Sequence, residues 1–165
     1  MLDRGENPVE VQARAASHVL PAAPLADPLG RGTAKFIDLL IVGAAAQFLP
    51  PIGFLAGLTY MLIADGIPSG PGLGKRILGL VVRTAGGQPC TVRASVVRNL
   101  SIAVPMTIWY VFGQAGWLLG MVGWVALLGS LAVESVLMIG NPYGLRIGDE
   151  IASTVVVSEP ADPHR

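Results

Sequence analysis

An aspartate, Asp38, lies inside the apolar run from Phe36 to Leu49. An ionised carboxylate at that depth in a membrane costs on the order of 2.5–3.5 kcal/mol, so it usually has a buried partner or marks a functional site. The chain has four such apolar segments, at about residues 33–49, 52–67, 97–113 and 116–139. We therefore predict an all-α membrane protein, a four-transmembrane-helix bundle with a polar feature inside it.

The composition agrees with a membrane protein. Hydrophobic residues make up 52% of the chain and charged residues 13%, with a mean hydropathy of +0.61. That share of charge is about half of what soluble domains carry. The formal net charge is zero, so no overall basic field attracts nucleic acid, and we expect no nucleic-acid partner.

The polar ends of the chain predict its domain limits. Residues 1–30 contain acids and several prolines and differ from the basic start of a cleavable signal peptide, so we expect a disordered cytoplasmic tail there. Residues 31–157 should form one membrane domain with a cytoplasmic loop at 68–96. Residues 158–165 should form a flexible C-terminal tail.

Basic residues gather at one side of the predicted spans. They are Arg31 and Lys35 before the first span, Lys75, Arg76, Arg83, Arg93 and Arg98 between the second and third, and Arg146 after the fourth. The two hairpin tips, at residues 50–51 and 113–116, have no Lys or Arg. The positive-inside rule then places both termini and the central loop in the cytoplasm, with the loop against anionic lipid headgroups.

The central loop also contains a β-strand signal. Residues 76–83 are rich in β-branched and apolar side chains and are followed by Gly86-Gly87, and residues 154–157 have a similar pattern. We expect these two segments to form a small cytoplasmic β element. After the turn, Thr91 should cap an amphipathic helix with Arg93 and Arg98 that lies along the headgroups.

Three acids are predicted near the cytoplasmic side of the bundle. Asp38 shares one helix face with Arg31 and Lys35, and Lys35 is its nearest local partner. Asp65 and Glu134 lie close to the same ends of the second and fourth spans. These acids indicate either an ion network that fixes helix register or a relay for protons or cations.

No motif in the sequence predicts catalysis. The glycine-rich segment 70–75 fails the phosphate-loop pattern because Ser69 and Arg76 stand at its ends. Cys90 has no second cysteine to pair with, and no cluster of Cys and His has metal-ligand spacing. We therefore expect no metal, no cofactor and no enzyme activity.

Three separated blocks resemble the RDD family of bacterial membrane proteins. They are Arg31-x-x-Ala34-x-x-Ile37-Asp38, then Gly74-Lys75-Arg76-Ile-Leu-Gly79-Leu80-x-Val82, and finally Arg146-Ile-Gly148-Asp149-x-x-Ala152-x-Thr154-x-Val156. The resemblance implies a bacterial inner-membrane bundle with Arg31, Asp38 and Asp149 as its signature trio. Gly72 and Glu150 depart from the family pattern.

Two functions follow from these patterns. The first is transport of a proton, cation or small solute, with Asp38 as the buried acidic site, Arg31 tuning its charge and Asp149 anchoring the cytoplasmic end. The second is a non-catalytic scaffold or accessory subunit that binds a membrane protein partner. Small residues at Gly53-x-x-x-Gly57 and Gly116-x-x-x-Gly120 allow close helix packing within the chain or in a homo-oligomer.

Overall fold

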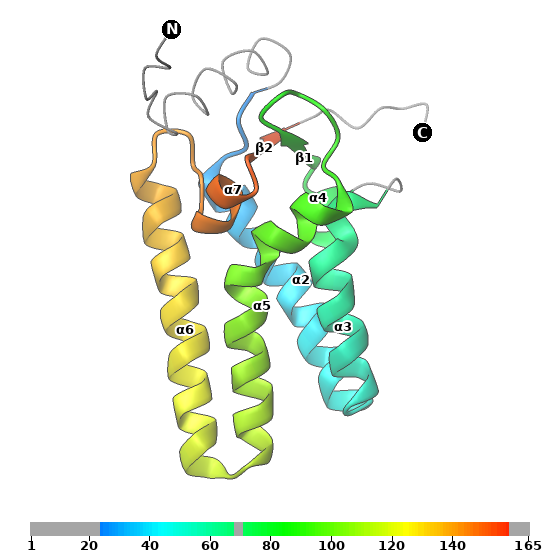
Figure 1. Cartoon of the computed structure of the whole chain (residues 1–165), viewed down its shortest axis with the longest axis vertical. Coiled ribbons are helices and arrows are strands. Elements are labelled where there is room, and N and C mark those ends of the chain that lie inside the picture. The colour runs from blue at the N-terminus through cyan, green and yellow to red at the C-terminus, as the bar shows by residue number, and fades with distance from the viewer. Residues whose placement is uncertain (1–23, 68–70, 159–165) are drawn as a thin grey trace, which may run out of the picture.

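The computed structural model describes residues 24–67 and 71–158. Most of these residues are helical, and they form two long helical hairpins with a group of short elements at one end (Figure 1). The tails predicted to be disordered or flexible lie mainly in residues 1–23 and 159–165, outside the described residues.

The first hairpin joins α2 (Pro28–Phe48) to α3 (Ile52–Ile63), which continues into a 3-10 turn, η1 (Ala64–Gly66). Helix α2 begins at Pro28, within the predicted tail, because Asp27 accepts a hydrogen bond from the Gly30 amide at 3.1 Å and proline suits the first helical position. It ends before the Pro50-Pro51 link, as the sequence predicts.

The second hairpin joins α5 (Val92–Gln114) to α6 (Trp117–Gly140). Thr91 accepts a hydrogen bond from the Ala94 amide at 3.2 Å, which confirms the predicted cap. The amphipathic segment and the third apolar segment form one continuous helix rather than two. Helices α5 and α6 are long and apolar enough to cross a membrane, by length and composition.

The short elements all lie at one end of the hairpins (Figure 1). They are α4 (Leu73–Ile77), β1 (Leu80–Thr84), α7 (Ile147–Ile151) and β2 (Thr154–Ser158). Strands β1 and β2 pair antiparallel, with Val82 opposite Val156. This confirms the predicted small β element, and we call this end of the molecule the cap.

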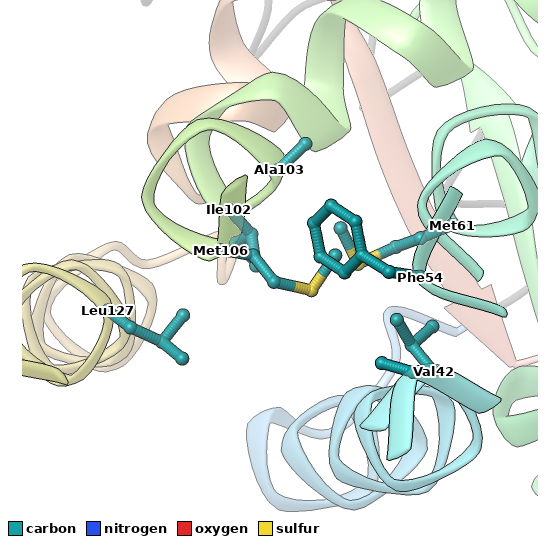
Figure 2. Close-up of a cluster of buried hydrophobic side chains, with 8 residues drawn as sticks. Val42, Phe54, Met61, Ile102, Ala103, Met106 and Leu127 are labelled. Carbon is teal, nitrogen blue, oxygen red and sulfur yellow. The ribbon is translucent and has the colours of Figure 1, made fainter. Parts of the chain in front are cut away.

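The apolar core lies between the long helices, in the part of the molecule between the cap and the hairpin tips. Figure 2 shows Val42 from α2, Phe54 and Met61 from α3, and Ile102 and Met106 from α5 converging on one volume, which α6 approaches with Leu127. Glycines set the close helix approaches: a Cβ at Gly57 would lie 2.8 Å from Val42 Cγ1, and one at Gly123 would lie 2.7 Å from Trp109 Cα. The small residues of α3 therefore serve packing within the chain.

Candidate functional site

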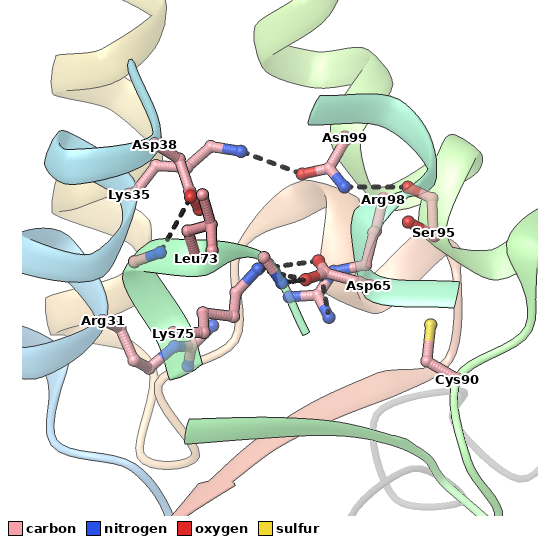
Figure 3. Close-up of polar contacts among 12 residues, drawn as sticks. Arg31, Lys35, Asp38, Asp65, Leu73, Lys75, Cys90, Ser95, Arg98 and Asn99 are labelled. Atoms are coloured by element: carbon pink, nitrogen blue, oxygen red, sulfur yellow. Dashed lines mark hydrogen bonds and ion pairs between the residues drawn. The ribbon is translucent and has the colours of Figure 1, made fainter. Parts of the chain in front are cut away.

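Among the described residues, nine charged side chains are buried where the long helices meet the cap, and we call them the charged cluster. Figure 3 shows six of them, Arg31, Lys35, Asp38, Asp65, Lys75 and Arg98. Helices α2 and α5, the turn η1 and the short helices α4 and α7 all contribute to the cluster. Its members are Arg31, Lys35, Asp38, Asp65, Lys75, Arg98, Glu134, Arg146 and Asp149. Charged groups at such burial are stable only with ion-pair or hydrogen-bond partners.

Asp149 of α7 is fully buried and forms ion pairs with three arginines. Arg31 of α2 forms an ion pair with its Oδ2, Arg98 of α5 places Nη2 2.7 Å from its Oδ1, and Arg146 places Nε 3.4 Å from its Oδ2. A second Arg31 nitrogen donates to the carbonyl of Gly144. One carboxylate thus holds together the first helix, the third long helix and the C-terminal segment of the cap.

The pKa of Asp149 lies well below its usual range. Burial alone would raise the pKa by destabilising the carboxylate, but the positive charges of Arg98, Arg146 and Arg31 outweigh that effect. The lowered pKa favours the charged form of Asp149, which suits it to the role of counter-charge for the three arginines.

Asp65 of η1 forms the second centre of the cluster. Lys75 of α4 donates from Nζ to both carboxylate oxygens, at 2.6 and 2.7 Å, and Arg98 places Nη1 3.7 Å from Oδ2. Arg98 is 1% exposed and forms ion pairs with both Asp65 and Asp149. Its guanidinium nitrogens lie at ion-pair distance from these carboxylates but not in the geometry of a hydrogen bond. Burial lowers the pKa of Lys75, and the charge of Asp65 opposes that shift.

Asp38 does not form an ion pair among the described residues. Its Oδ1 accepts hydrogen bonds from the Tyr60 hydroxyl at 3.1 Å and from the Gly74 amide at 3.0 Å, while the Tyr60 hydroxyl accepts from the Leu73 amide at 2.5 Å. These amides belong to the first turn of α4, which has no side-chain cap of its own. Asp38 and Tyr60, from two other helices, therefore supply the hydrogen-bond acceptors that the N-terminus of α4 lacks.

Lys35 turns away from Asp38, its nearest partner in sequence. Its ammonium instead donates to Asn99 Oδ1 on α5 at 3.0 Å (Figure 3). Asn99 in turn donates to the carbonyl of Ser95, one turn earlier in the same helix, at 3.0 Å. Within the described chain no carboxylate lies at ion-pair distance from Lys35, and its hydrogen-bond acceptor is the amide oxygen of Asn99.

Glu134 of α6 stands apart from these pairings. It is 4% exposed, and neither carboxylate oxygen has a hydrogen-bond partner among the described residues. It lines a cavity of about 200 Å³ between α2, α5 and α6, together with Lys35, Arg31 and Arg146. A buried carboxylate without a donor is costly, so this residue is the strongest pointer to a ligand in the cluster.

The structure brings together most residues predicted from the sequence. Arg31 and Asp149 of the signature trio are in contact, whereas Asp38 lies on the same helix as Arg31 but is bonded to α4. Arg76 is exposed and lies outside the cluster. A Cβ at Gly72 would lie 3.1 Å from Asp38 Oδ2, so a side chain at this position would crowd the carboxylate.

Sequence reasoning missed Arg98, Asn99 and Tyr60 as members of the site. Arg98 was expected to lie along the headgroups, but its placement in a continuous α5 turns it inward between two carboxylates. The available signal was its position one turn before an apolar run, where a charge needs a buried counterpart. Tyr60 and Asn99 carry no charge, and nothing in their spacing indicates their partners.

Among residues 24–67 and 71–158, no three His, Cys, Asp or Glu side chains come together as a metal site would require. Comparison of the chain with protein-family models, with curated proteins and with solved structures finds no match. The function is therefore argued from the geometry of this chain.

Proposed function

We propose that the chain is a four-span integral membrane protein of the RDD type. Support comes from α5 and α6, which have the length and hydropathy of membrane spans, and from α3, which is a shorter apolar helix. At 1.5 Å per residue the 21 residues of α2 extend about 31 Å, roughly the thickness of the hydrocarbon core. Large apolar side chains stay exposed along α6, such as Trp117, Val125 and Ile139, and suit contact with lipid.

The cap belongs in the cytoplasm under this proposal. The cap end carries the basic residues of the central loop and of both flanking segments, while the tips of the two hairpins carry none. The positive-inside rule supports a cytoplasmic location for both termini, and the resemblance to the RDD family implies a bacterial inner membrane.

As its activity, we propose transport of a proton, a cation or a small solute through a buried acidic site. One observation carries this proposal: the buried carboxylate of Glu134 has no hydrogen-bond partner among the described residues and lines a cavity together with Lys35. Intramembrane carboxylates of this kind mark ion pathways. Asp38 was the predicted site, but its bonds to α4 leave it less suited to bind and release an ion than Glu134.

A second hollow supports a path along the same helices. It has a volume of about 380 Å³, lies near the hairpin tips, and is lined by Gln47, Gln114 and aromatic side chains of α5 and α6. On each of α2, α5 and α6, one core residue lies between the residues that line the two hollows. These core residues are Val42, Met106 and Leu127. Rearrangement of this apolar barrier would give a solute access from the two sides in turn.

The experiment is flux through liposomes that contain the purified protein. We expect ion or proton movement that falls at least about tenfold in Glu134→Gln and survives in Asp38→Asn, because the latter amide oxygen still accepts the α4 hydrogen bonds. Glu150→Gln, outside the cavity, is the matched control. Absence of flux of H⁺, Na⁺ and K⁺ in the wild type would overturn ion transport.

A scaffold role is the alternative, and one observation favours it. Asp38, Asp65 and Asp149 are all engaged in contacts that fasten the cap to the helices, as a rigid support would require. Crosslinking in native membranes would then recover a membrane protein in fixed ratio to this chain. Recovery of the chain alone, together with measurable flux, would exclude this alternative.

A further inference from the structure

The cavity that contains Glu134 reaches the outer surface of the bundle. Its wall includes Gly32, Phe36 and Ser135, all of which are exposed, and Phe36 is 61% exposed. The rest of the wall combines apolar side chains with charged ones. The apolar residues are Leu39, Ile102, Leu131, Met138 and Val156, and the charged residues are Arg31, Lys35, Lys75, Glu134 and Arg146. The cavity thus combines an opening on the flank of the helices with a lining of apolar and charged side chains, as a site for a lipid molecule would.

Two charges of opposite sign remain incompletely satisfied at this cavity. Arg31 and Arg146 share the Asp149 carboxylate, and Lys75 pairs with Asp65. Among the described residues Lys35 has no carboxylate at ion-pair distance and donates to the amide oxygen of Asn99, and Glu134 has no hydrogen-bond partner there. No ion pair joins Lys35 to Glu134, although both line the cavity.

We propose that this cavity binds a phospholipid of the phosphatidylethanolamine class. The primary ammonium of the headgroup donates hydrogen bonds to the Glu134 carboxylate, the phosphate accepts from the Lys35 ammonium, and the acyl chains leave past Phe36. Both unmet charges then gain a partner in one step. This inference assigns a lipid to the cavity that the transport proposal gives to an ion or solute, and lipid binding tests it independently of flux.

Other occupants satisfy the cavity less well. Phosphatidylglycerol brings phosphate to Lys35, but its headgroup offers Glu134 only neutral hydroxyl donors, which bind a carboxylate less strongly than an ammonium does. A quaternary ammonium has no N–H group, so it also leaves the Glu134 carboxylate without a hydrogen bond. An inorganic cation serves Glu134 but leaves Lys35 and the apolar wall without a partner, and a free phosphoethanolamine does not cover that wall.

The test is lipid binding to the delipidated full-length protein in detergent, measured by native mass spectrometry. The probes are phosphatidylethanolamine, phosphatidylcholine and phosphatidylglycerol with identical acyl chains. We expect the wild type to prefer phosphatidylethanolamine to phosphatidylcholine by about tenfold, the ratio that a charge-assisted hydrogen bond provides. Glu134→Gln should reduce this preference severalfold, whereas Glu150→Gln, outside the cavity, should retain it.

A second variant separates the two halves of the headgroup. Lys35→Met should weaken binding of all three phospholipids severalfold, because it removes the phosphate partner, while Arg76→Gln at the surface should leave binding unchanged. Thermal unfolding identifies any variant that does not fold. In that case the preference of the wild type for phosphatidylethanolamine over phosphatidylcholine decides whether the proposal stands.

Three results would overturn the assignment. They are equal binding of phosphatidylethanolamine and phosphatidylcholine to the wild type, a preference for phosphatidylglycerol, and displacement of the lipid by an equal concentration of free phosphoethanolamine. A lipid preference without flux in liposomes would reject the transport proposal and leave this one standing. Flux without a lipid preference would do the reverse.

Discussion

Arg31 near the start of the first helix forms a buried ion pair with Asp149 of α7, 118 residues later in the chain. This direct contact joins the first described helix to the C-terminal part of the described chain. Its neighbours Arg98 and Arg146 reach the same carboxylate, so removal of the anion leaves three guanidinium groups facing one another. This arrangement makes Asp149 the most sensitive position of the cluster.

We expect Asp149→Asn to destabilise the protein by about 3–5 kcal/mol, because it leaves buried arginines without their counter-charge. Arg31→Gln should cost less, since Asp149 keeps two other cations. Thermal unfolding of the purified protein in detergent measures both changes. Arg76→Gln, on the exposed surface, is the matched control. Equal stability of Asp149→Asn and the wild type would show that the cap closes without this ion pair.

Two substitutions at Asp38 should separate its charge from its hydrogen bonding. The amide oxygen of Asp38→Asn still accepts from Tyr60 and Gly74, so we expect little change in stability. Asp38→Ala leaves the Gly74 amide without an acceptor and should cost about 1–3 kcal/mol. The difference between the two unfolding temperatures measures the effect. A greater loss in Asp38→Asn than in Asp38→Ala would show that the negative charge itself is required.

The contact of α4 with α2 should depend on the absence of a side chain at Gly74. A Cβ there would clash with the backbone carbonyl of Ala34, so we expect Gly74→Ala to destabilise the protein by about 2 kcal/mol or more. Gly43→Ala on α2 is the control, because its Cβ would meet no atom within 4 Å and should be neutral or slightly stabilising. Unfolding temperatures that fall equally for both variants would reject the close approach.

Stability should respond to acid through Asp149. Its pKa is lowered in the folded protein by three arginines, so its contribution is fully present above the unfolded pKa of about 3.9 and is lost as the pH falls toward the folded value. We expect an unfolding temperature that decreases below about pH 4 and depends less steeply on pH in Asp149→Asn. Parallel curves for the two proteins would assign the acid response to other carboxylates.

The long elements could be predicted from the sequence because their signals are local. Apolar segments and the Pro50-Pro51 link mark the first hairpin, and the β-branched segments mark the sheet. The short helices α4 and α7 were not predicted, since five residues cannot form a stable helix alone and these depend on partners from distant segments. Asp38 supplies such a partner for α4.

Most charged members of the candidate site could be predicted from the sequence, with Arg98 the exception, but their pairings could not. Sequence spacing places Lys35 beside Asp38, yet Lys35 bonds to Asn99 on α5, because the packing of α2 against other helices decides which way each side chain turns. Glu134 was predicted near the cytoplasmic end of its span. Its lack of a partner emerges only when all the neighbouring acids and bases are accounted for.

The order in which the ribosome makes the chain gives the Asp149 contacts a further consequence. Arg31 and Arg98 are synthesised well before α7, so both precede the carboxylate that they share. In the proposed membrane topology, Arg31 is during that interval a positive charge without this partner, and Arg98 has Asp65 alone, on the side that retains basic residues. Under that proposal the same arginines first orient the helices in the membrane and then fasten the cap to them once Asp149 is made.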